Sequence, residues 1–481
     1  MNTDAQWPSP EMAKIKVLEI QAKLHRWAKE SPEMVFEDLY NLVSEPAFLV
    51  DAWSRVKRNK GSRSSGVDGQ TVLGIKVGSG ELDFLSEIRC LLKSRAFRPF
   101  PVRERMIPKP GSAKLRRLGI PTVCDRVVQA SLKSVLEPIF EADFHPCSYG
   151  FRPNRRAQDA IAEIHFFATR GYEWVLEGDI EACFDEIDHT ALLSRVRRRI
   201  GDRKIVNLVK SFCKSGILTE AKSLIGSKTG TPQGGILSPL LSNIALSALD
   251  EVFARRWKEF GASSAKRQYR RKKGLPTYRL VRYADDFVIL VAGNRIHTED
   301  LLVESQKALG PMGLRLSEEK TLITHVDRGF DFLGFRIQRR RKPGCQKTMV
   351  YTWPRKDALA IVKSKVREVT RIDRNASLSI LLGYINPILR GWTNYFRHGV
   401  SKRTFSYLRA FTWRRVICWL RHKHPKRSWK SLKRMYLPNW WPTEGERQLF
   451  NTGEVTVTRY RYRSCKIPTP WDDILQNGAT A

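Results

Sequence analysis

The sequence predicts an α+β fold, in which helices and a mainly antiparallel sheet are followed by an all-helical part. Three observations support this fold class. Apolar residues at helical spacing dominate residues 11–58. Short runs of β-branched and aromatic residues, bounded by turn residues, recur between residues 98 and 338. After about residue 355 the pattern becomes helical and very basic.

Individual elements are expected where the apolar periodicity is clearest. Helices are expected at residues 11–58, 82–92, 124–142, 236–258 and 299–309 and from about residue 189, and strands at residues 174–180, 278–292 (two runs), 314–325 and 330–338. The segment from Arg98 to Pro121 is expected to form a basic hairpin with its turn at Pro110-Gly111. Short strands separated by helices are the pattern of an α+β domain.

The charge of the chain indicates a polyanionic partner. Its 481 residues suffice for about three domains, and its 42% hydrophobic residues suffice for a sizeable core. The formal net charge is +36, and nucleic acid fits such a surplus best because each neutralised phosphate releases counterions. A ribosomal protein would share the charge but is usually shorter and lacks acidic clusters in apolar surroundings. An acidic membrane fits less well, since the chain shows no amphipathic basic anchor and no lipidation motif.

Targeting and cysteine patterns indicate a reducing compartment. The N-terminus carries Asp4 and Glu11 without an apolar core, so a signal peptide is not expected. The sequence contains no run of about 18 apolar residues, so no membrane span is expected. The eight cysteines form no Cys-x-x-Cys pair and no disulfide framework. We therefore expect a cytoplasmic protein with small buried thiols.

The first candidate catalytic motif is Tyr283-Ala-Asp-Asp286, which lies between two apolar runs. An isolated Asp-Asp pair is usually a solvated acidic turn. Here the flanking strands are expected to be buried on both faces, and the turn lacks the Gly or Asn that tight hairpins prefer. Two carboxylates held together in such a turn require a cation, and hard oxygen ligands suit Mg²⁺.

A second acidic segment contains Asp179, which ends an apolar strand 106 residues before Asp285. A carboxylate at the end of a strand can reach the tip of a hairpin on a neighbouring strand. Asp179, Asp285 and Asp286 could together hold two metal ions roughly 3.5–4 Å apart. One ion would activate an attacking 3′-hydroxyl and the other would stabilise the leaving pyrophosphate.

Other residues of this region give weaker signals. Asp185 and Asp188 are expected to be helix N-caps or solvated charges, and for Glu181 this interpretation and a functional one both stay open. Between the two acidic segments lies Thr231-Pro-Gln-Gly-Gly-Ile-Leu-Ser-Pro239, followed by a helix. Its glycines permit close approach of the backbone to a ligand.

These motifs, in this order, resemble the palm of reverse transcriptases, and residues 60 to 475 resemble the group II intron reverse transcriptase/maturase family. The other motifs that carry the resemblance are Gly66-Val-Asp-Gly69, Ile107-Pro-Lys-Pro110, Arg116 to Arg126, Ser148-Tyr-Gly-Phe-Arg-Pro-Asn154, Gly313 to Thr321, Phe332-Leu-Gly-Phe335 and Gly383 to Phe396. The resemblance implies a right-hand polymerase: an N-terminal helical extension (1–70), fingers and palm (71–345), an all-α thumb or X/maturase domain (346–438) and a DNA-binding-like tail (439–481).

The resemblance also implies roles for single residues. The ligands of two Mg²⁺ ions are matched by Asp179, Asp285 and Asp286, with the backbone carbonyl of Ile180. Residues that bind the incoming nucleotide are matched by Lys109 and Arg116 at the triphosphate, by Phe184 as an aromatic gate against a 2′-hydroxyl, and by Gln233 beside the nucleotide. Lys320 matches a general acid for pyrophosphate, and Gly334 matches the primer-grip turn. Phe184 could instead be a core aromatic, and Lys320 a surface lysine. Arg117 departs from the proline usual in the family, so the pairing at Arg116 could be shifted by one residue.

The function implied is RNA-directed DNA synthesis joined to splicing of an intron RNA and its retrohoming. The implied partners are the group II intron RNA, template RNA with a DNA primer, target DNA and dNTPs, in a bacterial, nucleoid-associated protein. The family's HNH endonuclease, with its Cys pairs and His ligands, is absent from this sequence. A splicing-only maturase and a domesticated reverse transcriptase of repair or phage defence are the alternatives. An intron RNA around the reading frame would distinguish them.

The last feature is a segment without any Asp or Glu, from Arg374 to Thr443. Its 15 Lys or Arg are interleaved with 13 aromatic residues, whereas a merely solvated basic face does not need such rings. The charges are expected to track phosphates and the exposed rings to stack on unpaired bases. The residues expected to bind nucleic acid here are Arg414, Arg415, Lys433 and Arg434.

Overall fold

The computed structural model describes residues 6–108, 115–372, 375–464 and 466–472 of the chain. These residues belong to two compact units. Unit 1 is Met1–Arg156, Leu176–Ile323 and Ser464–Ala481, and unit 2 is Ala157–Val175 and Thr324–Arg463. The predicted division into four domains stays a prediction, because these units are defined by contacts and not by role.

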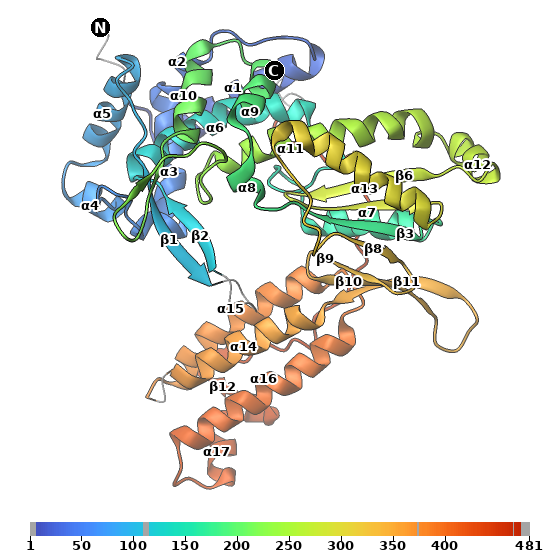
Figure 1. Cartoon of the computed structure of the whole chain (residues 1–481). Helices are drawn as coiled ribbons and strands as arrows, with labels where there is room; N and C mark the ends of the chain where they lie inside the picture. Colours follow the sequence, from blue (N-terminus) through green and yellow to red (C-terminus); the bar gives the residue numbers. More distant parts are fainter. Residues whose placement is uncertain (1–5, 109–114, 373–374, 465, 473–481) are drawn as a thin grey trace, which may run out of the picture. The chain divides into compact units, whose positions relative to one another are not determined.

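Groups of helices and groups of strands follow one another along the chain (Figure 1). The helices are α1 (Pro10–Glu30), α2 (Tyr40–Val43), α3 (Pro46–Arg58), α4 (Val72–Val77), α5 (Glu81–Lys93), α6 (Val123–Asp143), α7 (Ala157–Ala168), α8 (Cys183–Glu186), α9 (His189–Arg197), α10 (Arg203–Cys213), α11 (Ser238–Arg256), α12 (Ser264–Lys272), α13 (Arg295–Leu309), α14 (Lys356–Ile372), α15 (Leu378–Phe396), α16 (Lys402–Lys423) and α17 (Trp429–Tyr436). The strands are β1 (Val102–Pro108), β2 (Leu115–Ile120), β3 (Trp174–Asp179), β4 (Ile217–Leu218), β5 (Leu224–Ile225), β6 (Thr277–Tyr283), β7 (Asp286–Ala292), β8 (Leu322–His325), β9 (Phe330–Phe332), β10 (Phe335–Arg341), β11 (Thr348–Pro354), β12 (Thr443–Glu444) and β13 (Arg447–Gln448). Largely antiparallel sheets mixed with helices confirm the α+β fold class.

The basic hairpin predicted from the sequence is present in unit 1. β1 and β2 pair antiparallel from Arg103 opposite Ile120 to Pro108 opposite Leu115. The predicted turn at Pro110-Gly111 lies outside the described residues. β1 also pairs with β4, which gives a sheet in the order β2-β1-β4-β5. Helices α1, α3 and α6 pack against one another on buried apolar side chains and form the N-terminal core of the unit.

The second four-stranded sheet carries the acidic motifs. Its strand order is β6-β7-β3-β8. β6 and β7 form an antiparallel hairpin in which Tyr283 lies opposite Asp286. Every residue of β7 from Phe287 to Ala292 is buried, and α11 packs against β6. The expectation that this acidic turn is flanked by buried strands is therefore confirmed for β7.

A fully buried ion pair joins the β6–β7 hairpin to α11. The Arg282 guanidinium on β6 donates to both carboxylate oxygens of Asp250 on α11, at 2.8 and 2.5 Å. It also donates to Asn243 Oδ1 at 3.0 Å and to the Ala284 carbonyl at 2.9 Å. Burial disfavours the charged form of Arg282, but the Asp250 carboxylate outweighs it and raises the pKa of the guanidinium. The pair links the turn rigidly to α11.

Unit 2 joins a small sheet to a helical part. The sheet has the order β11-β10-β9, and α7 packs against β11. Helices α14, α15 and α16 then share a buried apolar core that includes Val366, Leu382 and Leu420. The predicted change to a helical part after about residue 355 is confirmed, since α14 begins at Lys356.

Some predicted elements differ in extent. The helical prediction for residues 11–58 is interrupted between α1 and α2, where Pro32 follows the helix end. The strand prediction for residues 314–325 was wrong for its first part, because only Leu322–His325 is extended within a sheet. No disulfide joins the cysteines that the structure describes. Within the same residues, no helix combines the length and apolar character that a membrane crossing needs.

The buried ion pair predicts a measurable loss of stability when one partner is removed. Arg282→Met or Asp250→Asn should each cost about 3–5 kcal/mol in chemical unfolding, because the remaining charged or polar partner is left buried and unpaired. The double replacement Arg282→Met with Asp250→Leu should recover much of that loss. As a control, Arg295→Met breaks the exposed pair with Glu299 and should cost less than about 0.5 kcal/mol. Equal losses for the buried and exposed pairs would contradict this account.

Candidate active site

Three carboxylates from two segments of unit 1 approach one another at the end of the β6-β7-β3-β8 sheet. Asp179 is the last residue of β3, Asp285 lies in the two-residue turn Ala284-Asp285 between β6 and β7, and Asp286 is the first residue of β7. The negative charges of Asp179 and Asp285 both act on Asp286, and that of Asp179 acts on Asp285. The structure therefore brings together the three acids that the sequence predicted to act jointly.

The shape of the acidic turn is imposed by the segment at residues 147–150. Ala284 has φ +58°, the left-handed conformation that primed hairpin turns require. Gly150 packs so closely on this turn that an added Cβ would lie 2.2 Å from the Ala284 nitrogen. The Tyr149 N–H donates to the Arg282 carbonyl at 2.8 Å, and the Asn243 amide donates to the Gly150 carbonyl at 2.9 Å. The turn is thus held from two sides.

Burial and the charges of neighbouring carboxylates shift Asp285 and Asp286 toward the protonated form. Burial raises the pKa of Asp285, and the Asp179 charge adds to the shift, whereas Arg116 and Arg282 lower it. Desolvation and the neighbouring carboxylates raise the pKa of Asp286 to about 6, although its side chain reaches solvent. A cluster of carboxylates with raised pKa values is typical of a site that binds a cation.

A lysine ammonium group lies beside the cluster. Lys320 Nζ is 2.7 Å from Asp179 Oδ2, and this hydrogen bond raises the pKa of Lys320. Ile180, which follows Asp179, has its backbone fixed between two neighbouring hydrogen bonds, Ser317 N–H to the Asp179 carbonyl and Glu181 N–H to the Arg315 carbonyl. Both predicted residues, Ile180 and Lys320, therefore lie at the acidic cluster.

The donor set fits Mg²⁺ by its chemistry. Mg²⁺ is usually held by one or two carboxylates together with substrate phosphates and water. Among the residues that the structure describes, no group of three or more His, Cys, Asp or Glu side chains stands ready to hold a metal by itself. The hydrogen bond from Lys320 to Asp179 already places one positive charge beside these carboxylates. Binding of two Mg²⁺ ions stays a proposal.

The segment that carries Phe184 is fastened to the glycine-rich loop. The Thr231 N–H donates to the Phe184 carbonyl at 2.6 Å, and the Gly230 N–H donates to the Ile187 carbonyl at 2.8 Å. Gly230 has φ +80°, and a Cβ there would lie 2.5 Å from the Asp185 carbonyl oxygen. The segment that carries Phe184 and the glycine-rich loop are therefore joined by backbone hydrogen bonds.

Gln233 connects these two segments to the β1–β2 hairpin. Its amide donates to Asp185 Oδ2 at 3.2 Å, and its carbonyl accepts from the Gly119 N–H at 2.7 Å. Asp185 is exposed, in agreement with the predicted solvated charge, and it also accepts this hydrogen bond from Gln233. Asp188 is confirmed as a helix N-cap, because its carboxylate accepts from the Ala191 N–H at 2.7 Å. Glu181 is exposed, and its role stays open.

Of the two residues predicted to bind the triphosphate, Lys109 and Arg116, the structure describes only Arg116. Arg116 lies on β2, and its charge lowers the pKa of both Asp285 and Asp286. Arg117 instead pairs with Glu104 at 2.8 Å. This division favours Arg116 over a pairing shifted by one residue. Lys109 lies outside the described residues.

In unit 2, Gly334 occupies the two-residue turn between β9 and β10. Leu333 and Gly334 have φ values of +48° and +78°, the pair of positive values that a type I′ hairpin turn requires. The Gly334 carbonyl accepts from the Arg355 N–H at 2.8 Å, and the Tyr395 hydroxyl donates to the Leu333 carbonyl at 2.9 Å. The turn is well defined, and its contact with a primer stays a prediction.

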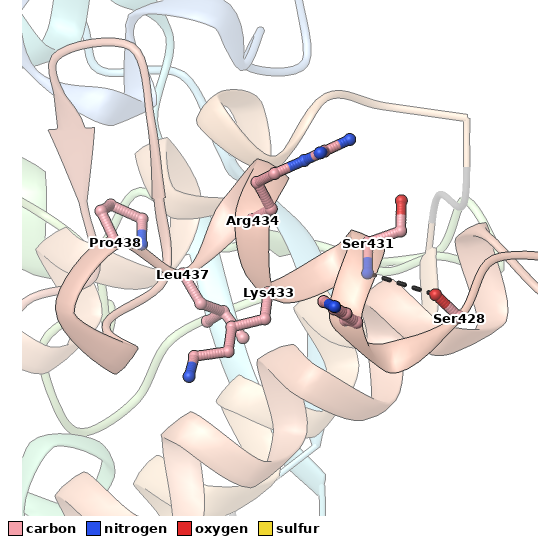
Figure 2. Close-up of a pocket in the computed structure, with 7 residues that line it drawn as sticks. Ser428, Ser431, Lys433, Arg434, Leu437 and Pro438 are labelled. Atoms are coloured by element: carbon pink, nitrogen blue, oxygen red, sulfur yellow. Dashed lines mark hydrogen bonds between the residues drawn. The ribbon is translucent and has the colours of Figure 1, made fainter.

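The four basic residues predicted to bind nucleic acid are not equivalent. Arg414 and Arg434 are exposed. Arg415 donates to Thr370 Oγ1 at 2.7 Å, and Lys433 lies 3.6 Å above the Trp440 ring. Figure 2 shows Lys433 and Arg434 projecting from α17 in different directions beside a cavity of about 540 Å³. The cavity is lined by Ser428, Lys430, Ser431, Lys433, Arg434, Leu437 and Pro438.

Three supporting residues were missed from the sequence. Arg282 and Asp250 were not singled out, because an isolated Arg or Asp is usually at the surface. Asn243, which bonds both Gly150 and Arg282, was missed for the same reason. The available signal was position: Arg282 stands two residues before Ala284 in a strand that is otherwise largely apolar.

Comparisons with known proteins agree with this geometry. Residues 107–337 match the family model "Reverse transcriptase (RNA-dependent DNA polymerase)". Residues 359–437 match the model "Group II intron, maturase-specific domain". The first match contains the three acids, and the second covers most of the helical part of unit 2.

Curated relatives match two thirds or more of this chain. Protein YkfC of Escherichia coli K12 is 36% identical over 390 residues, which is 76% of this chain and 100% of YkfC. The group II intron-encoded protein LtrA of Lactococcus lactis subsp. cremoris is 33% identical over 366 residues, which is 67% of this chain and 60% of LtrA. An uncharacterized 91 kDa protein in the cob intron of Schizosaccharomyces pombe is 29% identical over 432 residues, with 52% of its length covered.

The repulsion within the acidic cluster predicts that Asp286→Asn stabilises the metal-free protein. The raised pKa means that charged Asp286 costs stability fully above pH about 6, and this cost fades as the pH falls toward 3.8. Thermal unfolding at pH 7.5 in EDTA should show a gain on the order of 1 kcal/mol for Asp286→Asn. Added Mg²⁺ should raise the Tm of the native chain more than that of the variant.

The matched control for this measurement is Asp300→Asn, which removes an exposed carboxylate on α13 of the same unit. It should change the stability by less than about 0.5 kcal/mol in either condition. A lower stability of Asp286→Asn in EDTA would mean that the Asp286 carboxylate serves the fold and not a cation.

Proposed function

The chain belongs to the family of group II intron-encoded reverse transcriptases that carry a maturase domain, and we propose that it is an active RNA-directed DNA polymerase. The observation that carries this proposal is the cluster of Asp179, Asp285 and Asp286 with raised pKa values at Asp285 and Asp286. A site that had lost its catalytic function would have no need to keep three repelling carboxylates at one place.

Each residue of the cluster region has a task in nucleotidyl transfer. Asp179, Asp285 and Asp286, with the Ile180 carbonyl, would hold two Mg²⁺ ions, which supply charge neutralisation for the attacking 3′-oxygen and the leaving pyrophosphate. Lys320 would donate a proton to that pyrophosphate, and the hydrogen bond of its ammonium group to Asp179 supports this role.

The neighbouring residues would bind and select the nucleotide. Arg116 would bind the triphosphate through its fork of N–H donors, and Lys109 is proposed for the same task. Gln233, fixed by Asp185 and Gly119, would position the base and sugar of the incoming nucleotide. Phe184 would exclude ribonucleotides, because its ring would clash with a 2′-hydroxyl.

The proposed partners follow from the two matched domains. Intron RNA, a template RNA with a DNA primer, and target DNA would bind the basic surfaces of the chain, and dNTPs would be the substrates. Association with the nucleoid would follow from binding of target DNA. The chain spans 60% of LtrA, so retrohoming as a whole is proposed from the shared part alone. The primer-grip role of Gly334 belongs to the same proposal.

Two other functions compete with this one. A splicing-only maturase would bind RNA without copying it, and a domesticated reverse transcriptase would serve repair or phage defence. The presence of all three acids favours an enzyme over the splicing-only alternative. The match to the maturase-specific model at residues 359–437 favours an intron-associated protein over the domesticated one.

The catalytic proposal predicts that Asp179→Asn or Asp285→Asn abolishes DNA synthesis on a primed RNA template. Intron RNA affinity should barely change, because a neutral amide replaces one of several repelling charges. Primer extension and filter binding measure the two effects. The control is Asp188→Asn in the same acidic segment, because Asn caps a helix as well as Asp and should keep near-normal extension. Near-normal extension by both active-site variants would leave the splicing-only function.

The RNA-binding proposal predicts that Arg414→Ala combined with Arg434→Ala weakens intron RNA binding and flattens its salt dependence. Each lost phosphate contact should lower the slope of log K against log salt by roughly 0.7–0.9. Adding Arg415→Ala and Lys433→Ala should extend the effect, and splicing should suffer more than copying of a homopolymer. Lys210→Ala with Lys214→Ala removes the same charge from two exposed lysines at the C-terminal end of α10 as a control. An unchanged slope would mean that this segment is only a solvated basic surface.

A further inference from the structure

Phe151 is unusual among the side chains near the acidic cluster. Its side chain is large and apolar, yet 50% of it is exposed. Its backbone has φ +58°, a left-handed conformation that bulky residues rarely adopt. Such strained residues persist only where the surrounding structure holds them, and they concentrate at functional sites. Because half of the Phe151 side chain is exposed, its burial contributes little free energy to offset the strain of the positive φ. The presence of Phe at this position therefore requires another explanation.

The backbone is fixed on both sides of Phe151. Before it, Gly150 packs against the nitrogen of Ala284 in the acidic turn, and its carbonyl accepts from the Asn243 amide at 2.9 Å. After it, Arg152 forms a buried ion pair with Glu141, with Nη2 to Oε1 at 2.7 Å and both side chains 2% exposed. Phe151 is therefore held in a set position relative to the acidic turn.

The Phe151 ring lies against the ring of Phe184. Their centroids are 6.4 Å apart and their planes are inclined by 74°, which is the edge-to-face geometry that aromatic pairs favour. Phe184 is carried by α8, a helix of only four residues, so the orientation of its ring depends on contacts outside that helix. Phe151 supplies such a contact from a rigid segment.

We propose that Phe151 is a positioning residue for sugar discrimination, which keeps the Phe184 ring against the place of the nucleotide's 2′-carbon. The proposal rests on the proposed function, in which Phe184 excludes ribonucleotides. Without the edge-to-face contact the Phe184 ring can turn aside, and a 2′-hydroxyl then finds room. An aromatic pair of this kind corresponds to roughly a 2- to 10-fold change in an equilibrium, so the discrimination should fall by a similar factor.

The variant that tests this role is Phe151→Gly, because it removes the ring and also relieves the backbone strain, since Gly adopts positive φ readily. Its Tm should equal or exceed that of the native chain. Primer extension with dNTPs and with rNTPs gives the ratio of the two kcat/KM values, and this ratio should fall about 2- to 10-fold. Phe151→Tyr keeps an aromatic ring and should retain the native ratio. A role in stability alone would lower the Tm and leave the ratio unchanged.

A double-mutant cycle shows whether Phe151 acts through Phe184. Phe184→Val should admit ribonucleotides strongly, and adding Phe151→Gly to it should change the ratio no further. If Phe184→Val leaves ribonucleotide use unchanged in an active enzyme, the gate assigned in the proposed function is wrong. If Phe184→Val admits ribonucleotides but Phe151→Gly keeps the native ratio, the role proposed for Phe151 is wrong. Equal effects of Phe151→Gly in both backgrounds would also overturn it.

Discussion

Repulsion among three carboxylates is the constraint on which the rest of unit 1 depends. Asp285 lies in the two-residue turn and Asp286 begins β7 directly after it, and the charge of Asp179 acts on both. The turn is held in place by a buried, bidentate ion pair between Arg282 and Asp250. A single buried pair with all its hydrogen bonds satisfied gives the strained turn a fixed position. Under the proposed function, bound cations would relieve the repulsion within the cluster.

The proposed nucleotide site is assembled from segments that are far apart in the sequence. Gln233 contacts Asp185 through its side chain and Gly119 through its carbonyl, so three separate segments meet at one residue. Phe184 is fastened to Thr231 on one side and meets Phe151 on another. A change in any of these segments is therefore expected to reach the others through backbone contacts.

The sequence was informative where local pattern decides the structure. The β6–β7 hairpin follows from apolar runs on both sides of Asp285-Asp286, and Asp188 as a cap follows from its place before α9. The sequence was uninformative where contacts between distant segments decide the structure. The burial of Arg282 depends on Asp250 across the fold, and the strain at Phe151 depends on the packing of Gly150. Strand β11 was also missed, and the strand predicted at 330–338 stopped short, because the basic residues Arg339–Arg341 belong to β10 and pair with β11.

The central claim is that Asp179, Asp285 and Asp286 hold two divalent cations at a primer terminus. It is tested most directly by electron paramagnetic resonance of Mn²⁺ bound to the full chain with a primed RNA template and a non-hydrolysable dNTP analogue. The account predicts two bound, magnetically coupled Mn²⁺ ions in the native chain and loss of the coupling in Asp285→Asn. A single bound ion, or coupling that survives unchanged in Asp285→Asn, would contradict it.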